Sequence, residues 1–231
     1  MLKKEKRPYT TAIILGGGSG RRMNTSITKQ RITLGGMSVL KRSVMAFEKC
    51  GDITDIIVVV RSDEVEFFNS ELKDVTKLKA VCIGGDSRPE SAECGFMLVD
   101  KECEYVAIHD AARPLATEKL LFDLVQIVQT ENCGAIAAEK MIDSVCRTDA
   151  DGSIQESVAR ENLWRIQTPQ VFPFSAICDA YRQLGSLELT DDSAAARACG
   201  IKVKVLDNPQ PNMKLTLQED LPLLSYLFKN R

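Results

Sequence analysis

The feature of this sequence that most constrains its fold is a regular alternation along the chain. Short apolar runs rich in branched residues alternate with segments whose apolar side chains recur at helical spacing. Runs such as Ala12–Leu15 are apolar on both faces, as in parallel sheets covered by helices on both sides. The pattern predicts an α/β fold with an open, mostly parallel, doubly wound sheet. Strands are expected at Thr11–Leu15, Asp55–Val60, Ala80–Ile83, Tyr105–His109, Ala135–Ala138 and Lys202–Leu206.

Capping signals place helices between these strands and after the last of them. Ser87-x-x-Glu90 and Thr216-x-x-Glu219 have the spacing of capping boxes, which predicts that a helix begins at each. A further helix is expected to start near Asp191 and to end at Gly200. The helices separate consecutive strands, as a doubly wound sheet requires.

Residues 140–167 interrupt the alternation. Two polar, strand-like runs, Asp143–Arg147 and Ile154–Val158, flank a turn that contains Asp151-Gly152. The pattern predicts a β-hairpin arm that protrudes from the main sheet, although a flexible surface excursion would also fit. A hairpin alone is only marginally stable in water, so we expect the arm to pack on something, and a second subunit is one candidate.

Composition bounds the function. The chain has 231 residues, 44% of them hydrophobic, which suits a single domain spanning 1–231. A net charge of -2 gives no basic excess, so nucleic acid is not an expected partner. No apolar run reaches the ~20 residues of a membrane span, and we expect a cytoplasmic protein. The eight cysteines form no C-x-x-C pair and only one histidine is present, so we expect reduced thiols and no zinc cluster.

A glycine-rich loop follows the first predicted strand, at Leu15-Gly16-Gly17-Gly18-Ser19-Gly20-Arg21-Arg22-Met23. Glycines let a backbone approach a ligand closely and turn its N–H groups inward. The dinucleotide pattern G-x-G-x-x-G fails here, which argues against a nicotinamide-dependent oxidoreductase, and the G-K-[ST] of a P-loop is absent. The cations Arg21, Arg22 and Lys29 suit a triphosphate.

Three further motifs carry polar side chains. His109–Pro114 closes a predicted strand, and there Asp110 is placed to hold Mg²⁺ against phosphate oxygens. Arg113 can donate two parallel hydrogen bonds to a phosphate, whereas His109 is expected to be structural. Gly84–Ser91 offers backbone groups and hydroxyls to a base or ribose. Asn212–Thr216 places a lysine just before a predicted helix.

Taken in order, these motifs resemble one family. They are the glycine loop with R-R-M, then K-Q, G-G-D-x-R-x-x-S, H-D-A-A-R-P, an arginine before L-W, Q-T-P-Q, T-D-D and N-x-K-x-T. The set, from about residue 10 to 227, resembles 2-C-methyl-D-erythritol 4-phosphate cytidylyltransferase of the non-mevalonate isoprenoid pathway. The resemblance implies a Rossmann-like nucleotidyltransferase that joins CTP to a sugar-alcohol phosphate with Mg²⁺ and releases pyrophosphate. It also implies a homodimer joined through the arm, with shared active sites.

The resemblance also implies roles for individual residues. Arg22, Lys29 and Lys214 would stabilise the pentavalent α-phosphate, and Arg160 is counted among the catalytic residues as well. CTP would bind to Leu15, Gly16, Gly17, Gly18, Ser19, Gly20, Gly85, Asp86, Arg88 and Ser91. The acceptor would bind to Asp110, Arg113, Ser144, Arg160 and Thr190, with Asp110 also holding the metal.

The sequence departs from the family pattern at a few positions, and two rivals remain open. The family usually has alanines at Gly16 and Gly17, a valine at Ala92, an aromatic residue at Arg31 and a threonine at Ser144. A ribitol-5-phosphate cytidylyltransferase has a similar first loop and Q-T-P-Q, but tends to have Ser-Val in place of Ala111-Ala112. The other rival is a catalytically inactive nucleotide-binding regulator, against which the full set of cations and Asp110 argues.

Overall fold

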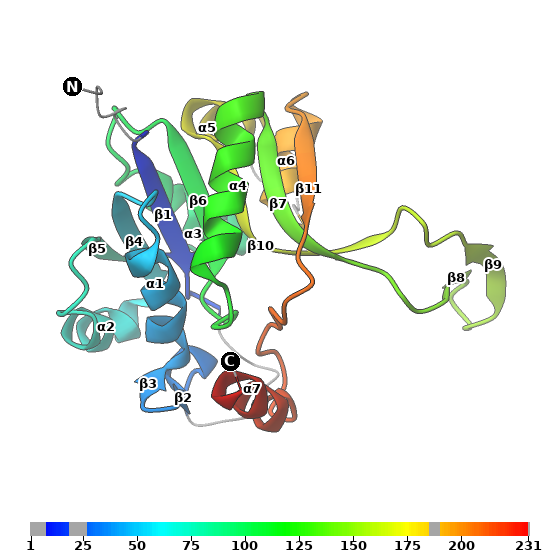
Figure 1. Ribbon diagram of the computed structural model, residues 1–231, viewed down its shortest axis with the longest axis horizontal. Helices are drawn as coiled ribbons and strands as arrows, with labels where there is room; N and C mark the ends of the chain where they lie inside the picture. The colour runs from blue at the N-terminus through cyan, green and yellow to red at the C-terminus, as the bar shows by residue number, and fades with distance from the viewer. Residues whose placement is uncertain (1–7, 19–26, 185–189, 231) are drawn as a thin grey trace.

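The computed structural model describes residues 8–18, 27–184 and 190–230. Seven strands form its main sheet, in the order β11-β7-β10-β6-β1-β4-β5 (Figure 1). The strands are β1 (Thr10–Leu15), β4 (Asp55–Val60), β5 (Leu78–Ile83), β6 (Tyr105–Asp110), β7 (Gly134–Lys140), β10 (Trp164–Pro173) and β11 (Val203–Asp207). The six strands expected from the sequence are therefore confirmed, with small differences at their ends.

One strand of the main sheet was not expected from the sequence. β10 lies between β6 and β7 and runs antiparallel to both, whereas the other neighbouring strands pair in parallel. Its run Gln167-Thr168-Pro169-Gln170 is polar and contains a proline, which argues against a central strand. The register shifts between Ile166 and Gln170, so the proline falls in an irregular stretch of the ladder.

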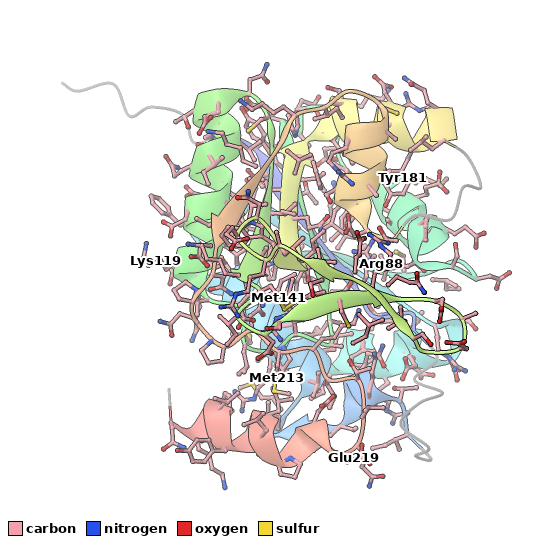
Figure 2. All side chains as sticks on the ribbon, turned by 90° about the vertical axis from the view of Figure 1, so that its right-hand side faces the viewer. Arg88, Lys119, Met141, Tyr181, Met213 and Glu219 are labelled. Atoms are coloured by element: carbon pink, nitrogen blue, oxygen red, sulfur yellow. The ribbon has the colours of Figure 1, made fainter. Side chains whose placement is uncertain are left out.

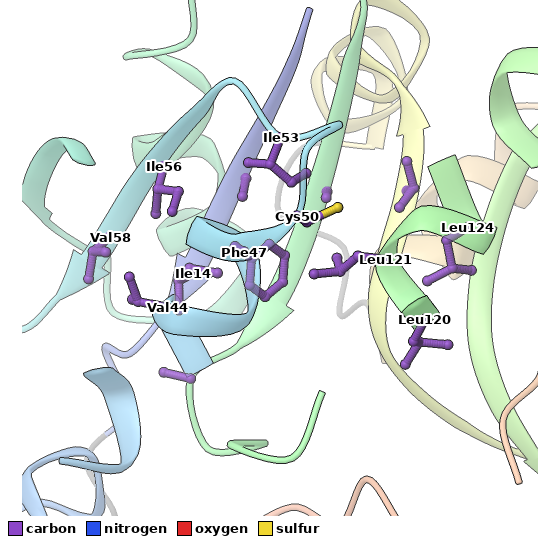
Figure 3. Packing of buried hydrophobic residues seen from close by; sticks show 14 of the residues in the cluster. Ile14, Val44, Phe47, Cys50, Ile53, Ile56, Val58, Leu120, Leu121 and Leu124 are labelled. Atoms are coloured by element: carbon purple, nitrogen blue, oxygen red, sulfur yellow. The ribbon is translucent and has the colours of Figure 1, made fainter. Parts of the chain in front are cut away.

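Helices cover both faces of the sheet, as the two-sided apolar strands require (Figure 1). On one face lie α1 (Val39–Lys49), α2 (Val65–Glu71) and α4 (Glu118–Glu131), which pack on side chains such as Ile14 and Val58 (Figure 3). On the other lie α3 (Arg88–Phe96), α5 (Phe174–Leu184) and α6 (Asp192–Ala198), which pack on the alternate residues Ile13 and Val59. Within the described ranges, no helix is long and apolar enough to cross a membrane.

The remaining elements are small and peripheral. A short 3₁₀ helix, η2 (Lys29–Arg31), precedes the short hairpin of β2 (Thr33–Leu34) and β3 (Met37–Ser38). A second one, η3 (Ser62–Glu64), follows β4 and leads into α2. The C-terminal helix α7 (Asp220–Lys229) packs beside β2 and β3 through Leu34 and Leu224. β8 (Val145–Thr148) and β9 (Ile154–Val158) pair antiparallel and form the tip of an arm that extends away from the sheet (Figure 1).

The helix-start predictions have different outcomes. At α3 the capping box is present, with Ser87 and Glu90 bonded reciprocally to the backbone. Asp191 caps α6, and Gly200 follows that helix with a positive φ of 78°. The predicted box at Thr216 is wrong: α7 begins at Asp220, whose carboxylate accepts the N–H groups of Thr216 and Leu217. The Asp220 side chain thus accepts the backbone N–H groups of the turn that precedes α7, and Thr216 caps no helix.

Candidate active site

A cavity of about 730 Å³ lies at the carboxyl ends of the four neighbouring strands β6, β1, β4 and β5. Parallel strands bring the segments that follow them to one edge of the sheet, where open α/β folds bind ligands. The glycine loop follows β1, Arg61 follows β4, the turn at Gly85 follows β5, and Asp110 ends β6. The full lining is Leu15, Gly17, Gly18, Lys29, Gln30, Arg61, Gly85, Asp86, Ser87, Arg88, Ser91, Asp110, Ala112, Lys214 and Thr216.

The described part of the glycine loop, residues 16–18, is fixed from two sides. Gly16 donates its N–H to the carbonyl of Val59 at 2.6 Å, which ties the start of the loop to β4. Gln30 is buried and donates its side-chain amide to the carbonyl of Gly18 at 3.3 Å. Because Lys29 precedes Gln30 in η2, the same short helix that holds Gly18 also places Lys29 in the cavity lining.

Asp110 lies at the centre of the charged residues. Its Oδ1 accepts a hydrogen bond from Arg88 Nε at 3.2 Å, and its Oδ2 accepts one from Lys214 Nζ at 2.6 Å. Burial alone would raise the pKa of Asp110, but the neighbouring charges of Arg88 and Lys214 hold it well below its ordinary value. The carboxylate is therefore ionised at neutral pH although it is almost fully buried.

His109 supports Asp110 from beneath and takes no part in the cavity lining. The amide N–H of Asp110 bonds to Thr168 Oγ1 at 3.0 Å, and this hydroxyl bonds to His109 Nδ1 at 3.1 Å. His109 Nε2 lies 3.1 Å from the carbonyl of Arg113, which can only accept, so the proton is on Nε2. Burial lowers the pKa of His109 to about 4, so the ring is neutral.

Lys214 reaches the cavity because its segment is anchored on both sides. Asn212 donates its side-chain amide to Gln167 Oε1 at 3.0 Å and to the carbonyl of Thr168 at 2.9 Å. The next anchor is the N–H of Leu215, which bonds to the carbonyl of Ala112 at 2.8 Å. These bonds explain why a lysine far along the chain lies beside the end of β6.

Most of the residues expected to bind CTP meet in this cavity. Leu15, Gly17, Gly18, Gly85, Asp86, Arg88 and Ser91 line it, together with Lys29, Asp110 and Lys214. Gly16 lies just behind, packed near Leu40 and Val59. Ser19, Gly20 and Arg22 lie outside the described residues.

The other residues expected to bind the acceptor do not line the cavity of this single chain. Arg113 is turned toward the carbonyl of Asn212, to which its Nη1 donates at 2.7 Å. Thr190 is exposed just before α6, and Ser144 lies on the arm. Arg160 is also on the arm, where its guanidinium donates to the carbonyl of Ile142.

Sequence reasoning missed several residues of the site. Arg61 lines the cavity, and its position directly after a buried strand could have revealed it. Asp192 lies within the T-D-D motif, and its contact with Arg88 was not foreseen because the two residues are distant in sequence. Tyr181 falls in no motif at all.

The side chains around the cavity are suited to a divalent cation that is also bound by the phosphates of a nucleotide. They are less suited to a cation bound by protein ligands alone. Within the described ranges, no group of three or more His, Cys, Asp and Glu side chains could hold a metal ion. Asp110 is a carboxylate facing a cavity lined by cations, and Mg²⁺ is commonly bound by one or two carboxylates plus substrate phosphates. A cation that reached Asp110 would have to share it with Arg88 or Lys214.

A cavity at this edge of the sheet, with a glycine loop and several cations around one carboxylate, defines a nucleotidyltransferase of the α/β class. The model of one family, described as IspD: 2-C-methyl-D-erythritol 4-phosphate cytidylyltransferase, matches residues 10–229. The chain therefore belongs to the IspD family of cytidylyltransferases.

Relatives and solved structures agree with this assignment. The chain is 34% identical to the 2-C-methyl-D-erythritol 4-phosphate cytidylyltransferase of Alkaliphilus oremlandii over 96% of each chain. It is 36% identical to that of Endomicrobium trichonymphae, over 95% of this chain and 98% of the relative. The crystal structure of the 4-diphosphocytidyl-2C-methyl-D-erythritol synthase of Anaerococcus prevotii superposes with a TM-score of 0.85, at 29% identity over 97% of each chain.

Proposed function

We propose that this cavity transfers the cytidylyl group of CTP to 2-C-methyl-D-erythritol 4-phosphate and releases pyrophosphate, as in the rest of its family. One observation carries the proposal: Asp110, Lys214 and Lys29 line the same cavity as the glycine loop. The family match favours this acceptor over ribitol 5-phosphate, which the motifs alone had left open.

The reaction needs no covalent intermediate. A phosphate oxygen of the acceptor attacks the α-phosphorus of CTP in line, and pyrophosphate leaves from the opposite side. Catalysis then consists of positioning the two phosphates and stabilising the charge that develops between them. Lys29 and Lys214 are suited to that second task because their ammonium groups line the cavity, and Arg22 is expected to join them.

The metal belongs to the same proposal. When bound, Mg²⁺ would supply positive charge to the triphosphate, and Asp110 is the residue of this chain that would hold it. The side chain of Asp110 is already ionised and is held by Arg88 and Lys214, while Thr168 fixes its backbone N–H, so it requires no change of protonation to serve the metal or the acceptor.

The acceptor end of the site is expected to be completed by a second subunit. Ser144 and Arg160 lie on an arm that extends away from its own sheet (Figure 1). An arm of this form could bring both side chains to the cavity of another copy, and Arg113 and Thr190 remain candidates from the same chain. A homodimer with shared sites and a cytoplasmic location are predictions of this proposal.

A pyrophosphate-release assay tests the function. With CTP and Mg²⁺ we expect kcat/KM for methylerythritol phosphate to exceed that for ribitol 5-phosphate by at least about tenfold, or roughly 1.4 kcal/mol of transition-state binding. UTP in place of CTP serves as the control for the nucleotide. A higher kcat/KM for ribitol 5-phosphate would reject the acceptor assignment while leaving the cytidylyl transfer in place.

A further inference from the structure

A chain of buried polar contacts runs from the cavity into the protein beside Asp110. Arg88 donates two parallel hydrogen bonds to Asp192, from Nη1 to Oδ1 at 2.9 Å and from Nη2 to Oδ2 at 2.8 Å. The hydroxyl of Tyr181 donates to the same Oδ1 at 2.5 Å. The labels of Arg88 and Tyr181 mark the two ends of this chain of contacts in Figure 2.

Burial makes this arrangement difficult to break. The side chain of Asp192 is 0% exposed, and that of Arg88 is 27% exposed. Burial alone would lower the pKa of Arg88, but Asp192 raises it well above its ordinary value. Burial and the charge of Asp192 likewise raise the pKa of Tyr181, which therefore keeps its proton to donate. If Arg88 moved away, Asp192 would be left as a buried carboxylate without its cation, which is costly.

The third nitrogen of Arg88, Nε, connects the Arg88–Asp192 pair to Asp110. Each Nη atom donates to Asp192, and Nε donates to Asp110 Oδ1 at 3.2 Å, so one guanidinium joins the two carboxylates. The guanidinium is planar and rigid, so fixing its two Nη atoms also fixes Nε. The position of one Asp110 oxygen is thus set by α6 and α5 through a single arginine.

The two cations on Asp110 differ in their freedom to move. Within the described ranges Lys214 is bonded to Asp110 Oδ2, and its side chain is 37% exposed, so it can turn toward an arriving phosphate. Arg88 is compensated by two carboxylates and cannot follow a phosphate without leaving both. Arg88 lines the cavity, but its guanidinium is tied to Asp110 and Asp192 and is less free to move than Lys214.

We propose that Asp192 and Tyr181 are positioning residues that hold Arg88 against Asp110, and that they act on the acceptor end of the reaction and not on CTP binding. The inference rests on the proposed function, and of the two roles given there to Asp110, metal ligand and acceptor contact, it concerns the acceptor contact. It also changes the expected role of Arg88, from a contact to the cytosine or ribose to a support for the acceptor carboxylate.

Two variants test this assignment by steady-state kinetics. In Asp192→Asn the buried charge is lost, and we expect kcat/KM for methylerythritol phosphate to fall about tenfold, with the KM for CTP within about twofold of wild type. Tyr181→Phe keeps the ring and removes one donor to Asp192, so a smaller change in the same parameter is expected. If Asp192→Asn fails to fold, Tyr181→Phe carries the test alone.

Asp191→Asn is the matched control. Asp191 is the neighbouring carboxylate and caps α6, where it accepts the N–H of Ala194 at 2.9 Å, but it does not contact Arg88. Asparagine is an equally good cap, so the control makes the same chemical change with no expected change in either KM. Thermal unfolding of all three variants shows whether an effect on KM follows from lost stability.

The outcomes separate this inference from the proposed function. A rise in the KM for CTP, an equal rise for both substrates, or unchanged kinetics in folded Asp192→Asn would overturn it. CTP binding measured by calorimetry gives a readout without turnover: the Kd for CTP should stay within about twofold in Asp192→Asn, and a larger change rejects the inference. Absence of cytidylyl transfer by the wild-type protein would reject the proposed function and this inference with it, whereas a changed Kd for CTP in Asp192→Asn would reject this inference alone.

Discussion

His109 shows how much a single buried side chain contributes to the site. It is the one histidine of the chain, and it is 0% exposed. Its two nitrogens connect the hydroxyl of Thr168 to the carbonyl of Arg113, and its ring packs 5.0 Å from that of Phe47. A protonated ring would place a second donor against Thr168, which already accepts from Asp110. The residue is therefore structural, as the sequence had suggested.

The pKa of His109 predicts a dependence of stability on pH. The folded value, about 4, lies below the ordinary value of 6.5, so between these values the unfolded chain binds a proton that the folded chain does not. Stabilisation from the neutral ring is therefore complete above about pH 6.5 and is lost as the pH falls toward about 4, by about 3 kcal/mol in all. Urea unfolding at a series of pH values measures it.

His109→Gln is the comparison for this prediction. The variant is expected to be less stable at pH 7, because it loses ring packing against Phe47, but its unfolding free energy should change less between pH 7 and pH 5. The substitution removes the imidazole and leaves every carboxylate in place, so the carboxylates are expected to contribute to both proteins alike. Parallel pH curves for the two proteins would show that His109 is not the group responsible.

The contacts of individual residues were the part of the site least accessible from the sequence. Motifs placed Asp110, Lys29 and Lys214 near the nucleotide, because each follows a strand or belongs to a recognisable pattern. They did not reveal that Arg88 is held by Asp192, since these residues are 104 positions apart and the pairing depends on how α3 and α6 meet over the sheet. Sequence patterns indicate which residues approach the cavity, whereas tertiary packing decides which of them pair.

At the scale of elements, the sheet was predictable except for β10. The parallel strands are apolar runs that pack between two helical layers, so their composition identifies them. β10 instead carries polar residues that serve the site: Thr168 supports Asp110, and Gln167 binds Asn212. A strand whose side chains are used for hydrogen bonding loses the alternation by which strands are recognised.

The glycine loop after β1 makes a prediction about two adjacent residues. A Cβ at Gly16 would lie 2.8 Å from Leu40 Cδ1 and 3.2 Å from the carbonyl oxygen of Val59, in a packed region. A Cβ at Gly17 would meet only Ser91 Oγ, at 3.4 Å. Gly16→Ala should therefore lower the unfolding free energy by about 1–3 kcal/mol, whereas Gly17→Ala should change it little.

Urea unfolding of both variants, with the KM for CTP measured alongside, checks this prediction. The two substitutions are chemically identical and adjacent, so each serves as the control for the other. The expected sensitivity of Gly16 comes from its close contacts with Leu40 and Val59. Equal losses of stability in the two variants would mean that the loop adapts to the added methyl group. The contacts of Gly16 with Leu40 and Val59 would then not determine the cost of the substitution.

At the scale of the whole molecule, the arm is the part that a single subunit does not explain. β8 and β9 extend away from the sheet (Figure 1), and Ile142 and Ile154 on the arm are 72% and 69% exposed. A two-stranded hairpin with exposed isoleucines is only marginally stable in water by itself. The arm emerges from β7 and β10, whose pairing continues out to Lys140 and Trp164, so its base is firmly attached to the sheet.

A complementation experiment decides whether the arm serves a second subunit. Lys29 lines the cavity of the body, and Arg160 lies on the arm. Lys29→Ala and Arg160→Ala homodimers should each lose activity, by about 10²–10³ for a charge-stabilising donor. In a mixed dimer, the body with wild-type Lys29 would meet the arm with wild-type Arg160, so one intact site would form and activity would return to about half that of wild type per dimer. If Arg160 serves its own subunit, every site in the mixed dimer keeps one lesion and no activity returns. Mixed dimers verified by two affinity tags that stay inactive would therefore reject shared sites, even for a protein that is a dimer.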